Sequence, residues 1–105
     1  MTIKILLWCD DLMNRMRLES EWKASGATML KKRGTDTPDC IVVDLAVRNA
    51  CDHITQLRAT FPQVDIIVFG PQYDPEAFEA AKRAGATEVA ARGSIVERVS
   101  RRFPK

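Results

Sequence analysis

Apolar residues gather in five short runs along the chain. Most runs are rich in isoleucine, valine and leucine without clean alternation with polar residues, as is typical of strands covered on both faces. The runs are IKILLWC at 3–9, ATMLKK at 27–32, CIVVDL at 40–45, DIIVFG at 65–70 and TEVAA at 87–91. This pattern predicts a buried, largely parallel sheet.

Four further stretches have helical spacing and recognisable ends. They span 11–26, 52–62, 74–85 and 94–103. In the first, Gly26 supplies a stop, and the apolar residues at helical spacing are Leu12, Met16, Leu18 and Trp22. The third has Asp74 as its expected N-cap and Pro75 at its first helical position. The fourth opens with the pattern of a capping box, Ser94 to Glu97.

Strands alternating with helices imply parallel pairing and right-handed crossovers. We therefore expect a single α/β domain over residues 1–105, because a chain near this length buries one core. The predicted architecture is a three-layer, doubly wound sandwich of the flavodoxin-like type, with a five-stranded parallel sheet in the order 2-1-3-4-5.

One crossover is too short for a helix. Only GTDTPD, residues 34–39, separates the second apolar run from the third, whereas a normal crossover takes a dozen residues or more. An extended strap should replace the second helix of the fold. Such a strap would leave apolar surface near the first two strands open to a partner, including a second copy in a homodimer, unless Trp8 or Met29 folds over it.

Composition limits the class of protein. The chain is 46% hydrophobic and 29% charged, with a net charge of +2, too small to indicate nucleic acid. No run approaches the roughly 18 apolar residues of a membrane span, and none resembles a signal peptide. Three cysteines without metal-ligand spacing indicate reduced thiols and a cytoplasmic location, and a single histidine excludes a His-rich metal site.

Carboxylates follow the first predicted strand and end the third. Asp10 and Asp11 come directly after the first, and Asp44 lies late in the third, its expected neighbour. Ligands of this fold gather at the carboxyl ends of strands, where three carboxylates repel each other unless a cation such as Mg²⁺ lies between them. Arg92 follows the fifth strand and would bring a guanidinium to the same edge.

These segments resemble the receiver domain of bacterial response regulators, the CheY-like superfamily, over nearly the whole chain. The matching motifs are WCDD at 8–11, PDCIVVDL at 38–45 and AKRAGATEVAARG at 81–93. The resemblance implies two-component signalling or a phosphorelay. It implies Mg²⁺ bound by Asp10, Asp11, Asp44 and the carbonyl of Ala46, and a phosphoryl group accepted on Asp44 from a histidine kinase.

Several positions depart from the receiver pattern. Gly70 stands where receivers carry Ser or Thr, Val89 where they carry an aromatic switch residue, and Arg92 where they carry Lys. Arg keeps the charge but changes the hydrogen-bond geometry. We therefore expect a degenerate, stand-alone pseudo-receiver, not an enzyme, that acts on a partner protein and keeps an acidic Mg²⁺ pocket. The alternative is a working phosphoacceptor at Asp44, with Arg92 as the phosphate partner and a histidine kinase or downstream effector as the protein partner.

Three other interpretations are weaker. Cys9 and Arg15 form a C-x5-R pattern, which looks similar to low-molecular-weight tyrosine phosphatases, but the aspartates after Cys9 oppose thiol ionisation and phosphate binding. No GxGxxG follows a strand, which makes a dinucleotide cofactor improbable. Basic clusters at 31–33 and near the C-terminus (Arg98, Arg101, Arg102 and Lys105) suit an edge strand and a helix end better than nucleic acid.

Overall fold

The computed structural model describes residues 3–31, 34, 36–70 and 74–103. Its strands are β1 (Lys4–Trp8), β2 (Thr28–Leu30), β3 (Cys40–Asp44), β4 (Asp65–Gly70) and β5 (Glu88–Ala91). Its helices are α1 (Leu12–Ala24), α2 (Ala50–Thr60), α3 (Pro75–Ala84), a 3-10 turn at Arg92–Ser94 and α4 (Ile95–Ser100). The strands form one parallel sheet in the order β2-β1-β3-β4-β5, which confirms the predicted fold class.

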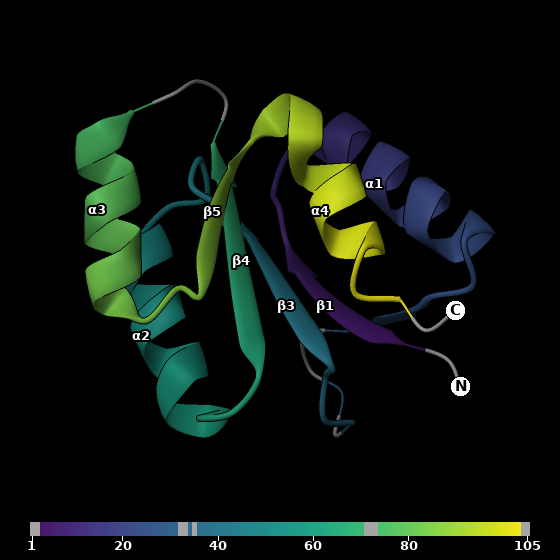
Figure 1. The fold of residues 1–105 in the computed structure, drawn as a ribbon, viewed down its shortest axis with the longest axis horizontal. Helices are drawn as coiled ribbons and strands as arrows, with labels where there is room; N and C mark the ends of the chain where they lie inside the picture. The colour runs from purple at the N-terminus through teal and green to yellow at the C-terminus, as the bar shows by residue number, and fades with distance from the viewer. Residues whose placement is uncertain (1–2, 32–33, 35, 71–73, 104–105) are drawn as a thin grey trace.

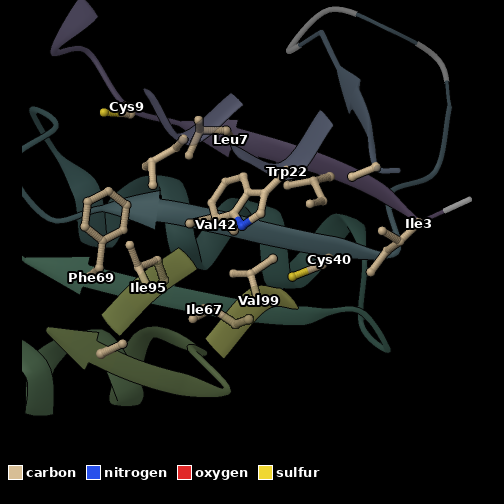
Figure 2. Close-up of a cluster of buried hydrophobic side chains, with 14 residues drawn as sticks. Ile3, Leu7, Cys9, Trp22, Cys40, Val42, Ile67, Phe69, Ile95 and Val99 are labelled. Atoms are coloured by element: carbon tan, nitrogen blue, oxygen red, sulfur yellow. The ribbon is translucent and has the colours of Figure 1, made fainter. Parts of the chain in front are cut away.

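The sheet lies between two helical layers, with α1 and α4 on one face and α2 and α3 on the other (Figure 1). Each face has its own apolar core, because successive strand residues point to opposite sides. Trp22 lies at the centre of the core beneath α1 and α4, surrounded by side chains of the central strands (Figure 2). It is fully buried, as predicted, and its indole N–H donates to the carbonyl of Val96.

Several predicted helix ends are confirmed. Gly26 follows α1 with a φ of 100°, as predicted, and Asp11, predicted only as a metal ligand, caps that helix by accepting from the backbone N–H of Asn14. Asp74 caps α3 by accepting from the N–H of Ala77, with Pro75 as the first helical residue. These ends follow from local chemistry, since short polar side chains satisfy backbone N–H groups that the first turn leaves free.

Two other ends differ from the prediction. The capping box at Ser94 is wrong: a 3-10 turn precedes α4, and the Ser94 hydroxyl donates to the carbonyl of Ala91. Helix α2 begins at Ala50 rather than Asp52, after Asn49 in a left-handed conformation with a φ of 58°. Asparagine tolerates that conformation better than most residues, which allows the tight entry into α2.

The predicted apolar stripe of α1 is only half right. The buried residues of this helix are Asn14, Leu18 and Trp22, four positions apart along one face. Leu12 and Met16 are each two positions from Asn14, which puts them on nearly the opposite side of the helix. They are 56% and 60% exposed. The polar Asn14 thus faces the sheet, and apolar side chains face outward.

The connection from β2 to β3, residues 31–39, contains no helix in its described part. Asp39 ties the end of this connection to the start of β1: its N–H donates to the carbonyl of Lys4, and its carboxylate accepts from the N–H of Lys4, both at 2.8 Å. The predicted loss of the second helix is therefore confirmed. Lys32 and Arg33 of the basic cluster lie outside the described residues, as does Tyr73 after β4.

The three arginines of the C-terminal basic cluster form ion pairs, and Lys105 lies outside the described residues. Arg102 contacts Asp65 and Glu88, both at 3.0 Å, and Arg98 contacts Glu88 at 2.9 Å. Hydrogen bonds from Arg98 and Arg102 lower the pKa of Glu88. The cluster was expected to be a solvated helix end, but α4 stops at Ser100, so Arg102 reaches the strands instead.

Arg58 joins the end of α2 to the two loops beside it. Its guanidinium donates to the carbonyls of Phe61, Pro62, Val64 and Gly85 and to the hydroxyl of Thr87, at 2.7–3.2 Å. Gly85 allows this approach, because a Cβ at that position would lie 2.9 Å from the Cβ of Arg58. One side chain thus satisfies four carbonyl groups.

We expect Arg58→Ala to lower the free energy of unfolding by about 2–3 kcal/mol, because half-buried carbonyls lose a charged donor. Chemical denaturation of the purified protein measures this. Arg83→Ala is the matched control: its contact with Glu79 is 4.0 Å long and exposed, so the change should stay within about 0.5 kcal/mol. Equal effects of the two substitutions would contradict the role of Arg58.

Candidate functional site

Strand register brings the ends of β1 and β3 together. Trp8 pairs with Val43, and Asp44 pairs with Phe69 of β4. Cys9, the residue after β1, therefore leaves the sheet beside Asp44. Both side chains point to the side of α1, which places the predicted acceptor at the carboxyl edge of the sheet.

Asp44 is buried, with only 1% of its surface exposed. One carboxylate oxygen, Oδ1, accepts from the N–H of Ala46 at 2.9 Å. The other, Oδ2, accepts from the thiol of Cys9 at 3.5 Å. A tight turn holds this arrangement, because the N–H of Val47 donates to the carbonyl of Asp44. Each oxygen therefore has a donor supplied by the protein.

The thiol of Cys9 is a partner of Asp44 that sequence reasoning missed. It has no exposed surface, and the side-chain amide of Asn14 approaches its sulfur at 3.9 Å. Burial, and then the negative charge of Asp44, raise the pKa of Cys9 to about 11. The group is thus a neutral thiol at physiological pH and can donate to the carboxylate. The matched positions of Cys9 and Asp44 at the ends of neighbouring strands were the available signal.

Asp10 and Asp11 are both exposed, unlike Asp44. Asp11 points one oxygen at the start of α1, where it accepts from the N–H of Asn14 at 3.3 Å. Within the described residues no group of three or more Asp, Glu, His or Cys side chains is placed to hold a metal ion. As arranged here, the three aspartates do not converge on one Mg²⁺ ion, and the magnesium site stays a prediction.

The remaining predicted residues lie around the same edge. Arg92 opens the 3-10 turn directly after β5 and is half-buried. Its Nε is buried and has no hydrogen-bond partner among the described residues, and no ion pair in that part of the chain joins it to Asp44. Gly70 ends β4 and pairs with Ala91 of β5, so the structure puts no hydroxyl at this strand end.

The C-x5-R pattern does not form a phosphatase-like site. Cys9 lies in the core with a raised pKa, whereas a nucleophilic cysteine needs an exposed thiolate. Arg15 lies on α1, 3.6 Å from Glu19. Cys9 is therefore not ionised, and Arg15 pairs with Glu19 instead of lying beside Cys9 as a phosphate ligand.

A groove opens where the second helix of the fold is absent. It lies between β1, β2 and α2 and has a volume of about 290 Å³. Trp8 stands at one side with its ring 4.5 Å from that of His53. Trp8 therefore lines the open face, and Met29 packs instead against the core beneath α1. Apolar surface remains open beside the strap.

Solved structures that are similar to this chain include response regulators and their receiver domains. The chain is similar to a putative response regulator from Chloroflexus aurantiacus, at 19% identity over 96% of this chain and 97% of that chain, with a TM-score of 0.82. It is similar to a CheY-like receiver domain protein from Methanospirillum hungatei, at 12% identity over 96% and 93%, with a TM-score of 0.82. It is also similar to a response regulator from Burkholderia pseudomallei that contains a phosphorylated aspartic acid, a calcium ion and citrate, at 18% identity over 98% and 67%, with a TM-score of 0.84.

The chain thus has the fold of CheY-like receiver domains over nearly its whole length. No family model matches it, and no curated protein matches it by sequence. In the part of the chain that the structure describes, no helix is both long and apolar enough to cross a membrane.

The site predicts how the three thiols react. Cys9 and Cys40 are fully buried, and burial raises the pKa of Cys40 to about 12, whereas Cys51 is half-buried on α2. We expect iodoacetamide at mildly alkaline pH to modify Cys51 first, and the other two only after denaturation. Mass spectrometry of the alkylated peptides checks this, with Cys51→Ser as the control. Rapid labelling of Cys9 in the native protein would show that the reagent reaches this thiol and that Cys9 is not enclosed beside Asp44.

Proposed function

We propose that this protein is a receiver-like signalling module that acts by binding a partner protein, without phosphoryl chemistry at Asp44. Its fold, shared with response regulators, supports a role in signalling. The partner is a histidine kinase or a downstream effector, and the location is the cytoplasm, where three free cysteines stay reduced.

The burial of Asp44 carries this proposal. A phosphoacceptor must present a carboxylate oxygen to an incoming phosphoryl group, with a cation to shield the charge. Here 1% of the residue is exposed, and the oxygen that is not held by the turn faces a thiol of the core. Phosphorylation would require Cys9 to leave that oxygen.

The surroundings of Asp44 support the same conclusion. In receivers, a hydroxyl on the fourth strand and an aromatic residue on the fifth convert phosphorylation into a change of shape. Gly70 and Val89 stand at these places and offer neither group. A module with this composition acts as a binding surface of one fixed shape, which is the degenerate pseudo-receiver predicted from sequence.

Amide NMR spectra with Mg²⁺ and beryllofluoride, a mimic of the phosphoryl group, test the proposal. We expect no shift at Asp44 or Ala46 that requires both reagents, because Asp44 is buried and both its oxygens are engaged. Asp44→Asn provides the matched control.

The opposite result would favour the alternative, a working phosphoacceptor. Shifts around Asp44 that need both reagents and vanish in Asp44→Asn would sink the present proposal. Arg92 would then be the group to examine as the phosphate partner, since its Nε is buried without a hydrogen-bond partner in the described residues.

The acidic pair is proposed as a residual Mg²⁺ site. Asp10 and Asp11 are exposed, and hard cations prefer carboxylate oxygens. Because Asp44 is held by Cys9 and Ala46, we expect Mg²⁺ to shift the amide signals of the exposed pair and to leave those of Cys9 and Asp44 in place. Titration with Mg²⁺ alone measures this, and the response should persist in Asp44→Asn. Loss of the response in that variant would mean that all three carboxylates bind the ion together.

A further inference from the structure

A second groove lies between α1 and β2, on the face of the sheet that α1 and α4 cover. Its volume is about 500 Å³, and its apolar lining comes from Leu7, Met29 and Leu30. Leu7 and Met29 both belong to the core beneath α1, and Met29 is only half-buried there. We call it the α1–β2 groove. It lies across the sheet from the groove beside Trp8, and the two share Leu30 and Lys31 at the sheet edge.

Basic side chains border the apolar floor of the α1–β2 groove. Arg15, Glu19 and Lys23 line it from α1, and their spacing of four residues puts them in one row along the helix. Lys31, which follows β2, adds a third cation. The described lining therefore holds three cations and one carboxylate, and its net charge is +2.

The chain itself neutralises only part of this charge. Arg15 lies 3.6 Å from Glu19, and both side chains are partly exposed. Among the described residues, no carboxylate forms an ion pair with Lys23 or Lys31, and both lysines are exposed. Two ammonium groups thus stand beside an apolar floor without a counter-charge from the described part of the chain.

The backbone directs Lys31 toward this groove. Successive side chains of an extended segment point to opposite faces, so Lys31 follows Met29 on the side of α1. The carbonyl of Lys31 accepts from the N–H of Gly34 at 2.9 Å, which holds the backbone in a turn at this point. The two lysines therefore border the groove from opposite sides, Lys23 from the helix and Lys31 from the strand.

We propose that the α1–β2 groove binds an acidic, amphipathic segment of a partner protein. Carboxylates of that segment meet Lys23 and Lys31, and an apolar side chain enters beside Met29. An apolar floor with a polar rim is the usual form of a groove that receives a protein segment. The net positive charge selects an acidic partner and steers its approach. The row from Arg15 to Lys23 is about 12 Å long, which matches about two turns of a bound helix.

The inference deepens the proposed function and rests on it, because it names the surface and the chemistry through which a module of one fixed shape binds its partner. The contact is small, so we expect a weak and reversible association. Its test involves no Mg²⁺, no beryllofluoride and no substitution at Asp44. A failure of that test therefore overturns the groove as the binding surface, whereas the beryllofluoride experiment decides separately whether Asp44 accepts a phosphoryl group.

Selection of peptides on the full chain is the first step of the test. The probe is a phage-displayed library of random peptides about 16 residues long. We expect the enriched peptides to combine a net negative charge with several apolar residues. A synthetic, fluorescent copy of the most enriched peptide then gives a Kd by fluorescence anisotropy. Replacing its apolar residues by serine should weaken binding, because the floor of the groove is apolar.

Charge reversal in the protein tests where the peptide binds. Lys23→Glu with Lys31→Glu should weaken binding of the acidic peptide at least about tenfold, because like charges repel. Lys82→Glu with Arg83→Glu is the matched control: it makes the same change of charge at exposed positions in the last turn of α3, away from the groove, and should bind the peptide like the wild type. A peptide with lysines in place of its acidic residues should prefer the groove variant. Circular dichroism confirms that each variant is folded.

Three results would overturn the inference. The first is enrichment of neutral or basic peptides, or of none. The second is an acidic peptide that binds the groove variant as tightly as the wild type, which would place its site elsewhere. The third is a chain that enriches no peptide but binds vesicles of phosphatidylglycerol and phosphatidylcholine through Lys23 and Lys31, which would make a lipid surface the ligand.

Discussion

The short connection between β2 and β3 is the constraint on which the rest of this structure depends. Residues 31–39 carry the chain past β1 without a helix in their described part, and Asp39 fastens the end of that path to Lys4 with two hydrogen bonds of 2.8 Å. The sheet order survives because an extended path can span the distance. Without a second helix, α2 covers only part of this face of β1 and β2, and the groove beside Trp8 remains.

On the other face of the sheet, beneath α1 and at the carboxyl ends of β1 and β3, a carboxylate is enclosed. Asp44 is held between the N–H of Ala46 and the thiol of Cys9, and burial keeps that thiol protonated. The neutral thiol of Cys9 thus lies beside Asp44, where the resemblance to receivers implies a Mg²⁺ ion. Asp44 is enclosed at this edge while Asp10 and Asp11 beside it are exposed, and exposed apolar side chains lie on α1 and beside the strap.

How much could be predicted differs between the fold and the site. The five strands, their order and the missing helix followed from runs such as CIVVDL and from the short link before it, since burial on both faces leaves a plain pattern. The cap Asp74 and the stop at Gly26 followed from local signals, whereas the capping role of Asp11 was not predicted. Asp44 was placed correctly at the sheet edge, but its enclosure by Cys9 was not foreseen, because a contact 35 residues apart depends on side-chain direction. The apolar stripe assigned to Leu12 and Met16 failed for a related reason, since periodicity does not say which face meets the sheet.

The sequence by itself determined the class of fold, the order of its elements and the identity of the residues at the carboxyl edge. Local propensity, strand burial and chain length decide these features, and each is visible in a short window of residues. Only the tertiary structure decided which of the three aspartates is buried, that Arg58 binds four carbonyl groups, and that Arg102 pairs with Asp65 and Glu88. These features depend on the directions in which distant side chains point once the layers have packed, and no local pattern encodes them.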